Sequence, residues 1–505
     1  MQIEPQSTAF AKRYARGEAQ VVWTTLVSDL ETPVSAFLKI AGARPMSFLL
    51  ESVEGGAVRG RYSIIGLDPD LVWRALSGRA EIDRTARSGR DGFVPCNEAP
   101  LAALRALIAE SRIELPDVLP PMAAGVFGYL GYDMVRLMEE LPQPNPDPIG
   151  IPDAVLVRPT IVVVFDAVKD AITVVTPVRP ESGVNADTAF TRAGERLSAI
   201  VDALDAPLAH APPNVKAGPL TVWPSSNPPP ADYERMVNTA KEYIAAGDIF
   251  QVVLSQRFEA PFELPPFALY RALRRVNPAP FLYFLDFDDF SVAGSSPEIL
   301  VRVREGTVTI RPLAGTRPRG ATPQQDKALE TELLADQKER AEHLMLLDLG
   351  RNDVGRVART ATVKVTDQFF IERFSQVMHI VSNVEGQLDA KYDALDALAA
   401  GFPAGTVSGA PKVRAMEIID ELEKEKRGLY AGAVGYFSAA GELDSCIVLR
   451  TALIKDGMMY VQAGAGIVAD SNPKSEQQEC VDKAKALFRA AEEAKRFASA
   501  ARRGQ

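Results

Sequence analysis

Hydrophobic and polar residues alternate along several paired segments of the chain at the spacing expected of β-strands. The paired runs are 160–165 with 171–177, 299–303 with 307–310, and 446–454 with 458–462. The last two pairs flank Glu305-Gly306 and Asp456-Gly457. A short turn containing glycine between two alternating runs is typical of a β-hairpin. The pattern therefore predicts three hairpins.

Apolar residues return every three or four positions in three other segments, which is the spacing of an amphipathic helix. These segments are 326–349, 411–426 and 473–497. Asn472 before Pro473 predicts the start of the last helix, because asparagine is a good N-cap and proline lacks only an N–H that would be unpaired there. Hairpins mixed with helices, without strict alternation of strand and helix, predict an α+β fold.

A proline-rich stretch at 203–230 separates two periodic regions and ends in three consecutive prolines. A concentration of prolines between two periodic regions indicates a linker. With 505 residues the chain exceeds the roughly 100 to 200 residues usual for one domain. We therefore predict an amino-terminal region at 1–202, a linker at 203–230 and a second region at 231–505.

The composition excludes several classes of protein. Apolar residues make up 47% and charged residues 24%, and no apolar run approaches the roughly 18 residues of a membrane span. The first residues lack a secretory pattern, so we expect a cytoplasmic protein with no membrane partner. Three cysteines at distant positions argue against a disulfide framework, and a net charge of −10 without a basic tract argues against nucleic acid.

Two acidic positions have both an ordinary and a chemical interpretation. Glu298 follows a β-like run at a tight turn, where a lone carboxylate is more often solvated or capping. On the predicted helix, Glu342 lies at an apolar border beside Ala341, Met345 and Leu346. A carboxylate at such a border forms a salt bridge or binds a cation, and the residues alone leave both alternatives open.

Two glycine-containing segments are candidates for ligand contact. In 401–412 a glycine-rich turn leads into a helix, whose free N–H groups attract anions, although Pro411 breaks the phosphate-loop spacing. In 462–467 two glycines lie in a strand, which often marks close approach of the backbone to a ligand. An ordinary loop followed by a helix cap explains the segment 401–412 equally well.

On the last predicted helix, Glu479 and Lys483 have the four-residue spacing of a common surface ion pair.

The chain has three histidines, none with the spacing of a catalytic triad. His210 falls in the linker. His379 lies in an alternating, strand-like segment, where a lone histidine is more often structural than catalytic.

Taken in order, these segments resemble the chorismate-utilising enzyme family, and within it the members that form anthranilate. The resemblance extends over nearly the whole chain, from 49–52 and 60–66 through 311–319 to the last helix. It implies a large composite α+β fold of layered antiparallel sheets with helices outside. It also implies the site residues. They are Glu342 and Glu479 as Mg²⁺ ligands; Gly315, Thr316, Tyr430, Arg450, Gly464, Ala465 and Gly466 as chorismate contacts; and Glu298, His379 and Thr406 as catalytic groups.

The implied reaction adds ammonia to chorismate and eliminates pyruvate to give anthranilate, a carbon–oxygen lyase step of tryptophan biosynthesis. Glu298 would protonate the departing hydroxyl and His379 would assist proton transfer. No cysteine lies in a nucleophile elbow of the form Gly-x-Cys-x-Gly. The resemblance therefore implies a separate glutamine amidotransferase subunit as the source of ammonia.

The resemblance also implies feedback inhibition by tryptophan at Ser52, Pro280, Phe281 and Leu282. Packing of a core strand is the alternative interpretation of the apolar residues in this set. Two other functions remain as alternatives, aminodeoxychorismate synthesis and a non-catalytic tryptophan sensor. Relatives that form aminodeoxychorismate, isochorismate or salicylate typically carry lysine where this chain has Ala314. The complete set of catalytic and metal-binding positions argues against a sensor.

Overall fold

The computed structural model describes residues 1–42, 44–54, 58–86, 92–208, 224–374 and 377–499. Its α-helices are α1 (Ser7–Ala15), α2 (Pro33–Ile40), α3 (Pro100–Glu110), α4 (Ala186–Asp205), α5 (Pro230–Ala246), α6 (Pro266–Val276), α7 (Pro323–Ala335), α8 (Gln337–Gly355), α9 (Ala394–Gly401), α10 (Lys412–Leu422) and α11 (Pro473–Ser499). Short 3-10 helices are η2 (Pro121–Ala123), η3 (Tyr132–Leu137) and η4 (Gly405–Val407).

The strands alternate with these helices irregularly. They are β1 (Gln20–Val27), β2 (Ser47–Glu54), β3 (Val58–Leu76), β4 (Arg79–Asp83), β5 (Val94–Pro95), β6 (Gly125–Leu130), β7 (Ala154–Asp166), β8 (Ala171–Val178), β9 (Ser225–Asn227), β10 (Gln251–Pro261), β11 (Phe281–Asp286), β12 (Phe290–Ser296), β13 (Ile299–Arg304), β14 (Thr307–Ile310), β15 (Leu313–Pro318), β16 (Lys364–Arg373), β17 (Val377–Gln387), β18 (Gly409–Ala410), β19 (Ala433–Ser438), β20 (Leu443–Ile447), β21 (Thr451–Lys455) and β22 (Met458–Ile467).

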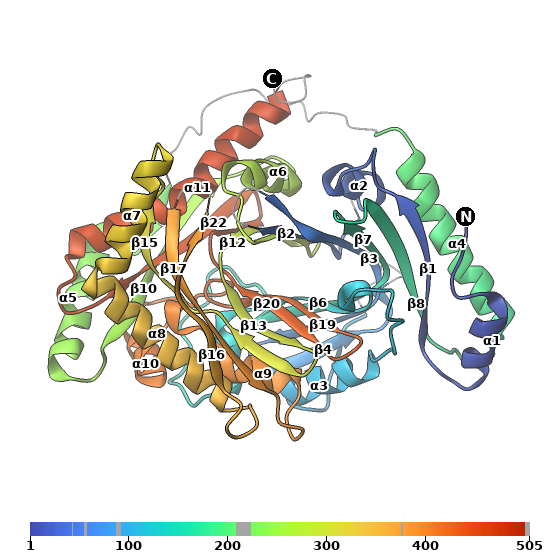
Figure 1. Cartoon of the computed structure of the whole chain (residues 1–505), viewed down its shortest axis with the longest axis horizontal. Coiled ribbons are helices and arrows are strands. Elements are labelled where there is room, and N and C mark those ends of the chain that lie inside the picture. Colours follow the sequence, from blue (N-terminus) through green and yellow to red (C-terminus); the bar gives the residue numbers. More distant parts are fainter. Residues whose placement is uncertain (43, 55–57, 87–91, 209–223, 375–376, 500–505) are drawn as a thin grey trace.

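The strands form antiparallel pairs throughout the described ladders and connect into one hydrogen-bonded network. Figure 1 shows this network folded into two layers, with β2, β12 and β22 in one layer and β13, β20 and β6 in the other. The helices lie around the outside, so the predicted α+β fold of layered antiparallel sheets is confirmed. In the described part of the chain, no helix is both long and apolar enough to cross a membrane.

Two of the predicted hairpins owe their turns to left-handed backbone. In the β13–β14 turn Glu305 has φ 48° and Gly306 has φ 72°, and in the β21–β22 turn Asp456 has φ 51° and Gly457 has φ 73°. Two positive φ values in a row match the right-handed twist of the flanking strands, and glycine adopts them without steric cost. These hairpins and the one formed by β7 and β8 are confirmed.

Two predicted elements are each divided into two in the structure, and a third ends early. The segment 326–349 is divided between α7 and α8 at Asp336, whose side chain accepts hydrogen bonds from the N–H groups of Lys338 and Glu339 and so caps the second helix. The segment 446–454 is divided between β20 and β21, because the chain turns at Arg450, which has φ 48°. The helix predicted at 411–426 ends at Leu422, whereas α11 begins at Pro473 under the predicted Asn472 cap.

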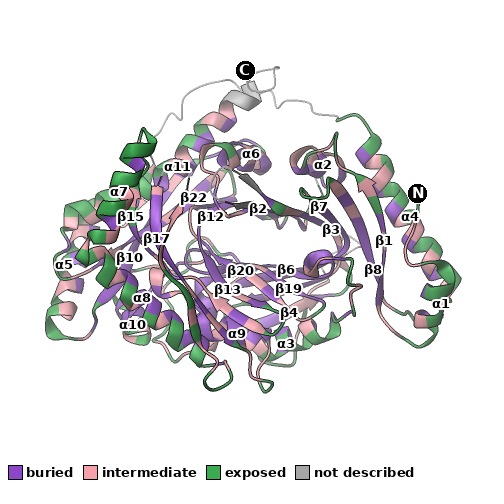
Figure 2. Ribbon diagram, viewed as in Figure 1, coloured by how far each residue is buried: buried purple, intermediate pink, exposed green. Residues whose placement is uncertain are grey.

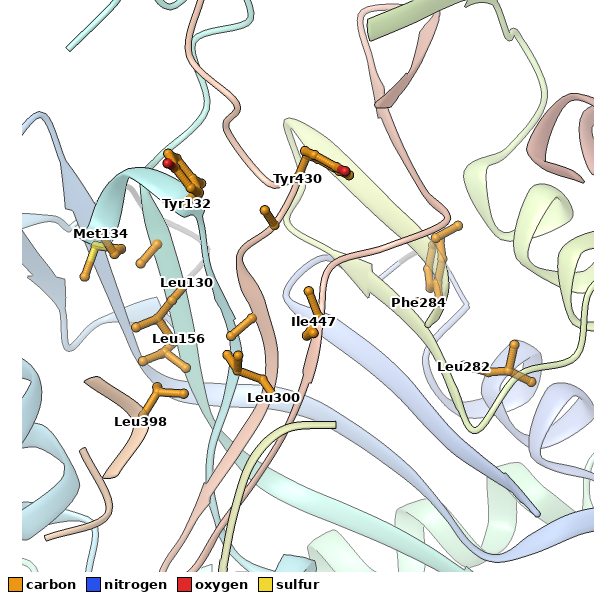
Figure 3. Packing of buried hydrophobic residues seen from close by; sticks show 14 of the residues in the cluster. Leu130, Tyr132, Met134, Leu156, Leu282, Phe284, Leu300, Leu398, Tyr430 and Ile447 are labelled. Carbon is orange, nitrogen blue, oxygen red and sulfur yellow. The ribbon is translucent and has the colours of Figure 1, made fainter. Parts of the chain in front are cut away.

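The interior joins both halves of the chain. Leu130 and Leu156 pack in the same buried cluster as Leu300 and Ile447, and Figure 3 shows these side chains together. Strand β2 pairs with β11, and β6 pairs with β19. Figure 2 shows the buried residues concentrated along the two strand layers. The predicted boundaries at 202 and 231 stay a prediction; His210 and residues 209–223 of the predicted linker lie outside the described residues.

Candidate active site

Glu298 lies between β12 and β13, where Pro297 ends the strand because it has no N–H for the ladder. The residue is only 6% exposed, and the Thr406 hydroxyl donates to its carboxylate oxygens at 3.2 and 3.3 Å. Burial raises the pKa of Glu298 to about 8, against the opposing effects of Thr406 and the Arg450 guanidinium. The solvated interpretation of this carboxylate is therefore wrong. A carboxyl group with this pKa is mostly protonated at neutral pH.

His379 lies on β17 opposite Thr316 of β15. Its Nδ1 lies 3.0 Å from the Thr316 hydroxyl oxygen and 3.1 Å from the Gly315 carbonyl oxygen. A carbonyl oxygen only accepts, so Nδ1 carries the proton of the neutral ring. Burial, with the nearby Arg450 charge, lowers the pKa of His379 to about 4. Nε2 has no hydrogen-bond partner among the described residues and is left as an unprotonated acceptor.

A bulge in β15 directs the Gly315 carbonyl towards His379. The register shifts between Ala314 and Thr316, and Gly315 has φ 74°. A Cβ at Gly315 would lie 3.2 Å from a Glu339 carboxylate oxygen and from a side-chain carbon of Ile380. Glycine is therefore favoured both by the backbone conformation and by the limited space.

Arg450 occupies the left-handed turn between β20 and β21. Burial lowers the pKa of its guanidinium, while Glu298 opposes this effect. Its charge acts on Glu298 and on His379, which places the guanidinium near both groups. A fork of N–H donors at this position suits a carboxylate ligand.

The segment Gly464–Gly466 of β22 lies against β10, with Ser255 opposite Gly464 and Val253 opposite Gly466. A Cβ at Gly464 would lie 2.7 Å from the Tyr430 hydroxyl oxygen and 2.8 Å from a main-chain carbonyl oxygen. A Cβ at Gly466 would lie 2.4 Å from the Gln251 amide nitrogen. Both glycines thus let neighbouring polar groups approach the strand, and Ala465 between them is fully buried.

Two helices each bring a carboxylate near these glycines, one through Gln251 and the other through Lys483. Glu342 of α8 is half-buried and lies 3.4 Å from the Gln251 amide nitrogen. Its pKa is raised by burial and by the charges of Glu339 and Glu479, the latter on α11. Like charges held together favour a bound cation. In the described ranges no three His, Cys, Asp or Glu side chains are placed to hold a metal by themselves.

Lys483 connects the two parts of the site. It pairs with Glu479 at 2.7 Å, as the spacing predicts, and its ammonium also donates to the Gly464 carbonyl oxygen at 2.9 Å. Its charge lowers the pKa of His379. The surface-pair interpretation is therefore confirmed, since the two side chains are 44% and 47% exposed. Gln251 had no signal in the sequence, because its role follows only from the pairing of β10 with β22.

The structure thus places the predicted catalytic and substrate positions in one region around β15, β17 and β22. The four predicted tryptophan positions line an adjoining cavity of about 560 Å³, together with Tyr62, Arg302 and Arg311. Ser52 lies opposite Phe281, which lies opposite Ser296 in turn. Glu298, two residues beyond Ser296, also lines this cavity. Leu282 is only 3% exposed, so core packing accounts for part of this segment.

The chain is similar to known proteins over most of its length. Residues 63–489 match the chorismate binding enzyme family. The chain is 57% identical over 503 residues to anthranilate synthase component 1 of Cereibacter sphaeroides, covering 98% of this chain and 99% of that protein. The solved structure of anthranilate synthase component I from Streptococcus pneumoniae is 39% identical, with a TM-score of 0.74 over 92% of this chain and 99% of that one.

A more distant structure extends the likeness of the fold. The menaquinone-specific isochorismate synthase of Escherichia coli has a TM-score of 0.68 and covers 96% of this chain and 100% of that one, at 20% identity. Such low identity supports the shared fold alone. The family match covers most of the chain, and the sequence likeness to anthranilate synthase component 1 covers nearly all of it. This chain belongs to the chorismate binding enzyme family.

Proposed function

We propose that this chain is the chorismate-converting component of an anthranilate synthase, which forms anthranilate and pyruvate from chorismate and ammonia. The observation that carries the proposal is that the Arg450 charge acts both on a buried Glu298, whose pKa is raised to about 8, and on a neutral His379, whose Nε2 has no partner among the described residues. One group is prepared to donate a proton and the other to accept one. The names of the most similar relatives support the same reaction.

In the addition step, ammonia bonds to the ring carbon ortho to the carboxylate and the ring hydroxyl leaves with its bonding electrons. Glu298 gives its proton to that hydroxyl, which departs as water, and the new ammonium group then returns a proton to the Glu298 carboxylate. Thr406 holds the carboxyl group in place through its hydroxyl. Arg450 binds the enolpyruvyl carboxylate with two N–H groups. Tyr430 and the backbone at Gly464–Gly466 orient the ring.

In the elimination step, His379 Nε2 accepts the proton from the ring carbon that carries the new amino group. The carbon–oxygen bond to the enolpyruvyl group then breaks and the ring becomes aromatic. The same proton can return to the methylene carbon to complete the methyl group of pyruvate. The hydrogen bonds at Nδ1 fix the ring so that Nε2 is the free nitrogen.

Glu342 and Glu479 would hold a Mg²⁺ ion. Oxygen donors of like charge, brought together from two helices, fit this ion, which keeps sites for water and for the substrate. When bound, the ion supplies positive charge that orients and polarises the ring carboxylate.

We further propose that ammonia comes from a glutamine amidotransferase partner. The three cysteines are free thiols. Burial raises the pKa of the Cys480 thiol to about 12 and raises that of Cys446 as well. Such thiols are poor nucleophiles because little thiolate forms near neutral pH. The reduced cysteines also support a cytoplasmic location.

Incubation of the purified chain with chorismate, Mg²⁺ and an ammonium salt tests the proposal. We expect the fluorescence of anthranilate to appear, and we expect none when glutamine replaces the ammonium salt. Formation of aminodeoxychorismate or isochorismate instead would overturn the proposed product. Absence of any turnover, with tryptophan binding retained, would favour the sensor alternative.

Tryptophan is the proposed feedback inhibitor, bound in the cavity beside Ser52. Its aromatic ring suits the apolar side chains of Phe281 and Leu282. Replacing Ser52 with phenylalanine fills part of this cavity. We expect the ammonia-dependent rate to stay within about twofold, while the tryptophan concentration for half inhibition rises at least about tenfold, a loss of about 1.4 kcal/mol of binding.

Ser52→Ala is the matched control, because it removes only the hydrogen bond that the Ser52 hydroxyl donates to the Tyr62 carbonyl oxygen, at 3.0 Å. It leaves the space for the ligand open. The tryptophan concentration for half inhibition should therefore be higher for Ser52→Phe than for Ser52→Ala. Unchanged inhibition of Ser52→Phe would place the tryptophan site elsewhere.

A further inference from the structure

A buried ion pair lies beneath the candidate active site. Glu423 follows α10, and Arg427 lies four residues farther along the chain. Their side chains are 6% and 1% exposed, and Arg427 donates to both Glu423 oxygens, at 2.6 and 2.8 Å. Neither residue belongs to the proposed catalytic or ligand-binding set. The pair is therefore a buried charged group that the proposed mechanism does not use.

The remaining donors of Arg427 reach two segments that carry site residues. One guanidinium nitrogen donates to the Val407 carbonyl oxygen at 2.8 Å, directly after Thr406. The other donates to the Val253 carbonyl oxygen at 2.6 Å, on β10 opposite Gly466. A single planar group thus links the turn that holds Thr406 to the strand that supports the glycines.

Glu423 strengthens the second of these links. Its Oε1 accepts hydrogen bonds from the Ser255 N–H at 2.8 Å and from the Ser255 hydroxyl at 2.9 Å. Ser255 lies opposite Gly464 in the ladder, and the Gln462 amide donates to its hydroxyl at 2.8 Å. The guanidinium carbon of Arg427 also lies 5.5 Å from the centre of the Tyr430 ring.

We propose that Glu423 and Arg427 are positioning residues, which set the separation between the Thr406 turn and the Gly464–Gly466 strand. The inference rests on the proposed function, because those two segments hold the proton donor and the substrate. Arginine is suited to this role, since its rigid fork directs several N–H donors at once. Lysine in its place retains the charge but cannot reach both carbonyl oxygens and both carboxylate oxygens.

The test is Arg427→Lys in the full chain, assayed with chorismate, Mg²⁺ and an ammonium salt. We expect kcat/KM for chorismate to fall at least tenfold, with a higher KM and a lower kcat, at a temperature where the protein is fully folded. Arg158→Lys is the matched control. Arg158 lies on β7 with a side chain only 7% exposed, and it pairs with Asp70 of β3 and Glu110 of α3. The Arg158→Lys variant should have a lower Tm than the wild type, but its kcat/KM for chorismate should stay within twofold of the wild-type value.

A double-mutant cycle with Thr406→Val separates positioning from a purely structural role. If Arg427 acts partly through Thr406, Arg427→Lys should cost a smaller fold-change in kcat in the Thr406→Val background than in the wild type. Equal fold-changes in the two backgrounds would overturn the proposal. So would unchanged kcat and KM in folded Arg427→Lys.

Glu423→Gln provides the same test if Arg427→Lys does not fold. It keeps an acceptor oxygen for Ser255 while removing the charge, and we expect the same direction of change in kcat and KM. Unchanged constants in this variant would also overturn the proposal. A wild-type chain that forms no anthranilate would instead contradict the proposed function, so the two failures are distinguishable.

Discussion

Replacing Glu298 with glutamine should lower the rate of ammonia addition by about 10²- to 10⁴-fold, the usual contribution of a general acid. Glutamine keeps the size of the side chain and an oxygen acceptor for the Thr406 hydroxyl, which lies 3.2 Å from the present carboxylate. It cannot give a proton to the departing hydroxyl. Single-turnover measurement of chorismate loss, with enzyme in excess, reports this step directly.

The pH profile provides a second measure of the same role. The acid must be protonated, and its pKa is about 8, so the addition rate per unprotonated ammonia should be level below that pH and fall above it. His379→Gln is the matched control, because it should spare addition and slow elimination, so that the aminated intermediate accumulates. Addition by Glu298→Gln at the wild-type rate would contradict the acid role.

Replacing Glu342 with glutamine should lower anthranilate formation by about 10²-fold at fixed Mg²⁺, since a bound metal supplies several kcal/mol of charge stabilisation. The variant removes one of two carboxylates from the proposed ion site. It should raise the Mg²⁺ concentration needed for half-maximal rate. A chelator should abolish activity of the wild type, and added Mg²⁺ should restore it.

Glu339→Gln is the control for this prediction, because Glu339 neighbours the site but pairs with Arg317 at 3.5 Å. We expect its rate to change by no more than about threefold, as for a partly exposed ion pair of about 0 to 1 kcal/mol. Binding of Mn²⁺, followed by its paramagnetic signal with and without chorismate, provides a readout that does not depend on turnover. Wild-type Mn²⁺ affinity in Glu342→Gln would remove this residue from the proposed ligands.

Local signals predicted much of the secondary structure. The hairpins at Glu305-Gly306 and Asp456-Gly457 were predictable because a two-residue turn between alternating runs needs left-handed backbone, which both pairs adopt. The start of α11 was predictable because the Asn472 side chain accepts from nearby N–H groups. In each case the interacting residues are close together in the sequence.

The predictions were wrong where a local pattern continued across a break. Asp336 lies inside an apparently continuous helical pattern, yet its side chain caps α8 and so begins a new helix. Arg450 lies inside an apolar run, yet its φ of 48° ends one strand before the next begins. Hydrophobic spacing reports which face is buried, but it does not report a change of chain direction when the spacing is preserved on both sides.

In the candidate site, too, some features were predictable from the sequence and others were not. The positions were named by resemblance, and the structure places the Arg450 charge where it acts on both Glu298 and His379, which come from different segments. Their protonation states were not predictable, because they depend on burial by elements far away in the sequence. From the residues alone Glu298 was expected to be solvated or capping, and the resemblance gave it the role of an acid; its burial, at 6% exposure, decided between the two.

By itself, the sequence determined the local elements of this protein, its α+β class and its family, since spacing, turn residues and motif order are all properties of the linear chain. Only the tertiary structure decided which charges are buried, which nitrogen of His379 is free, and that Arg427 joins the Thr406 turn to β10. The physical reason is that desolvation and hydrogen-bond partners are set by contacts between distant segments, which no local pattern records.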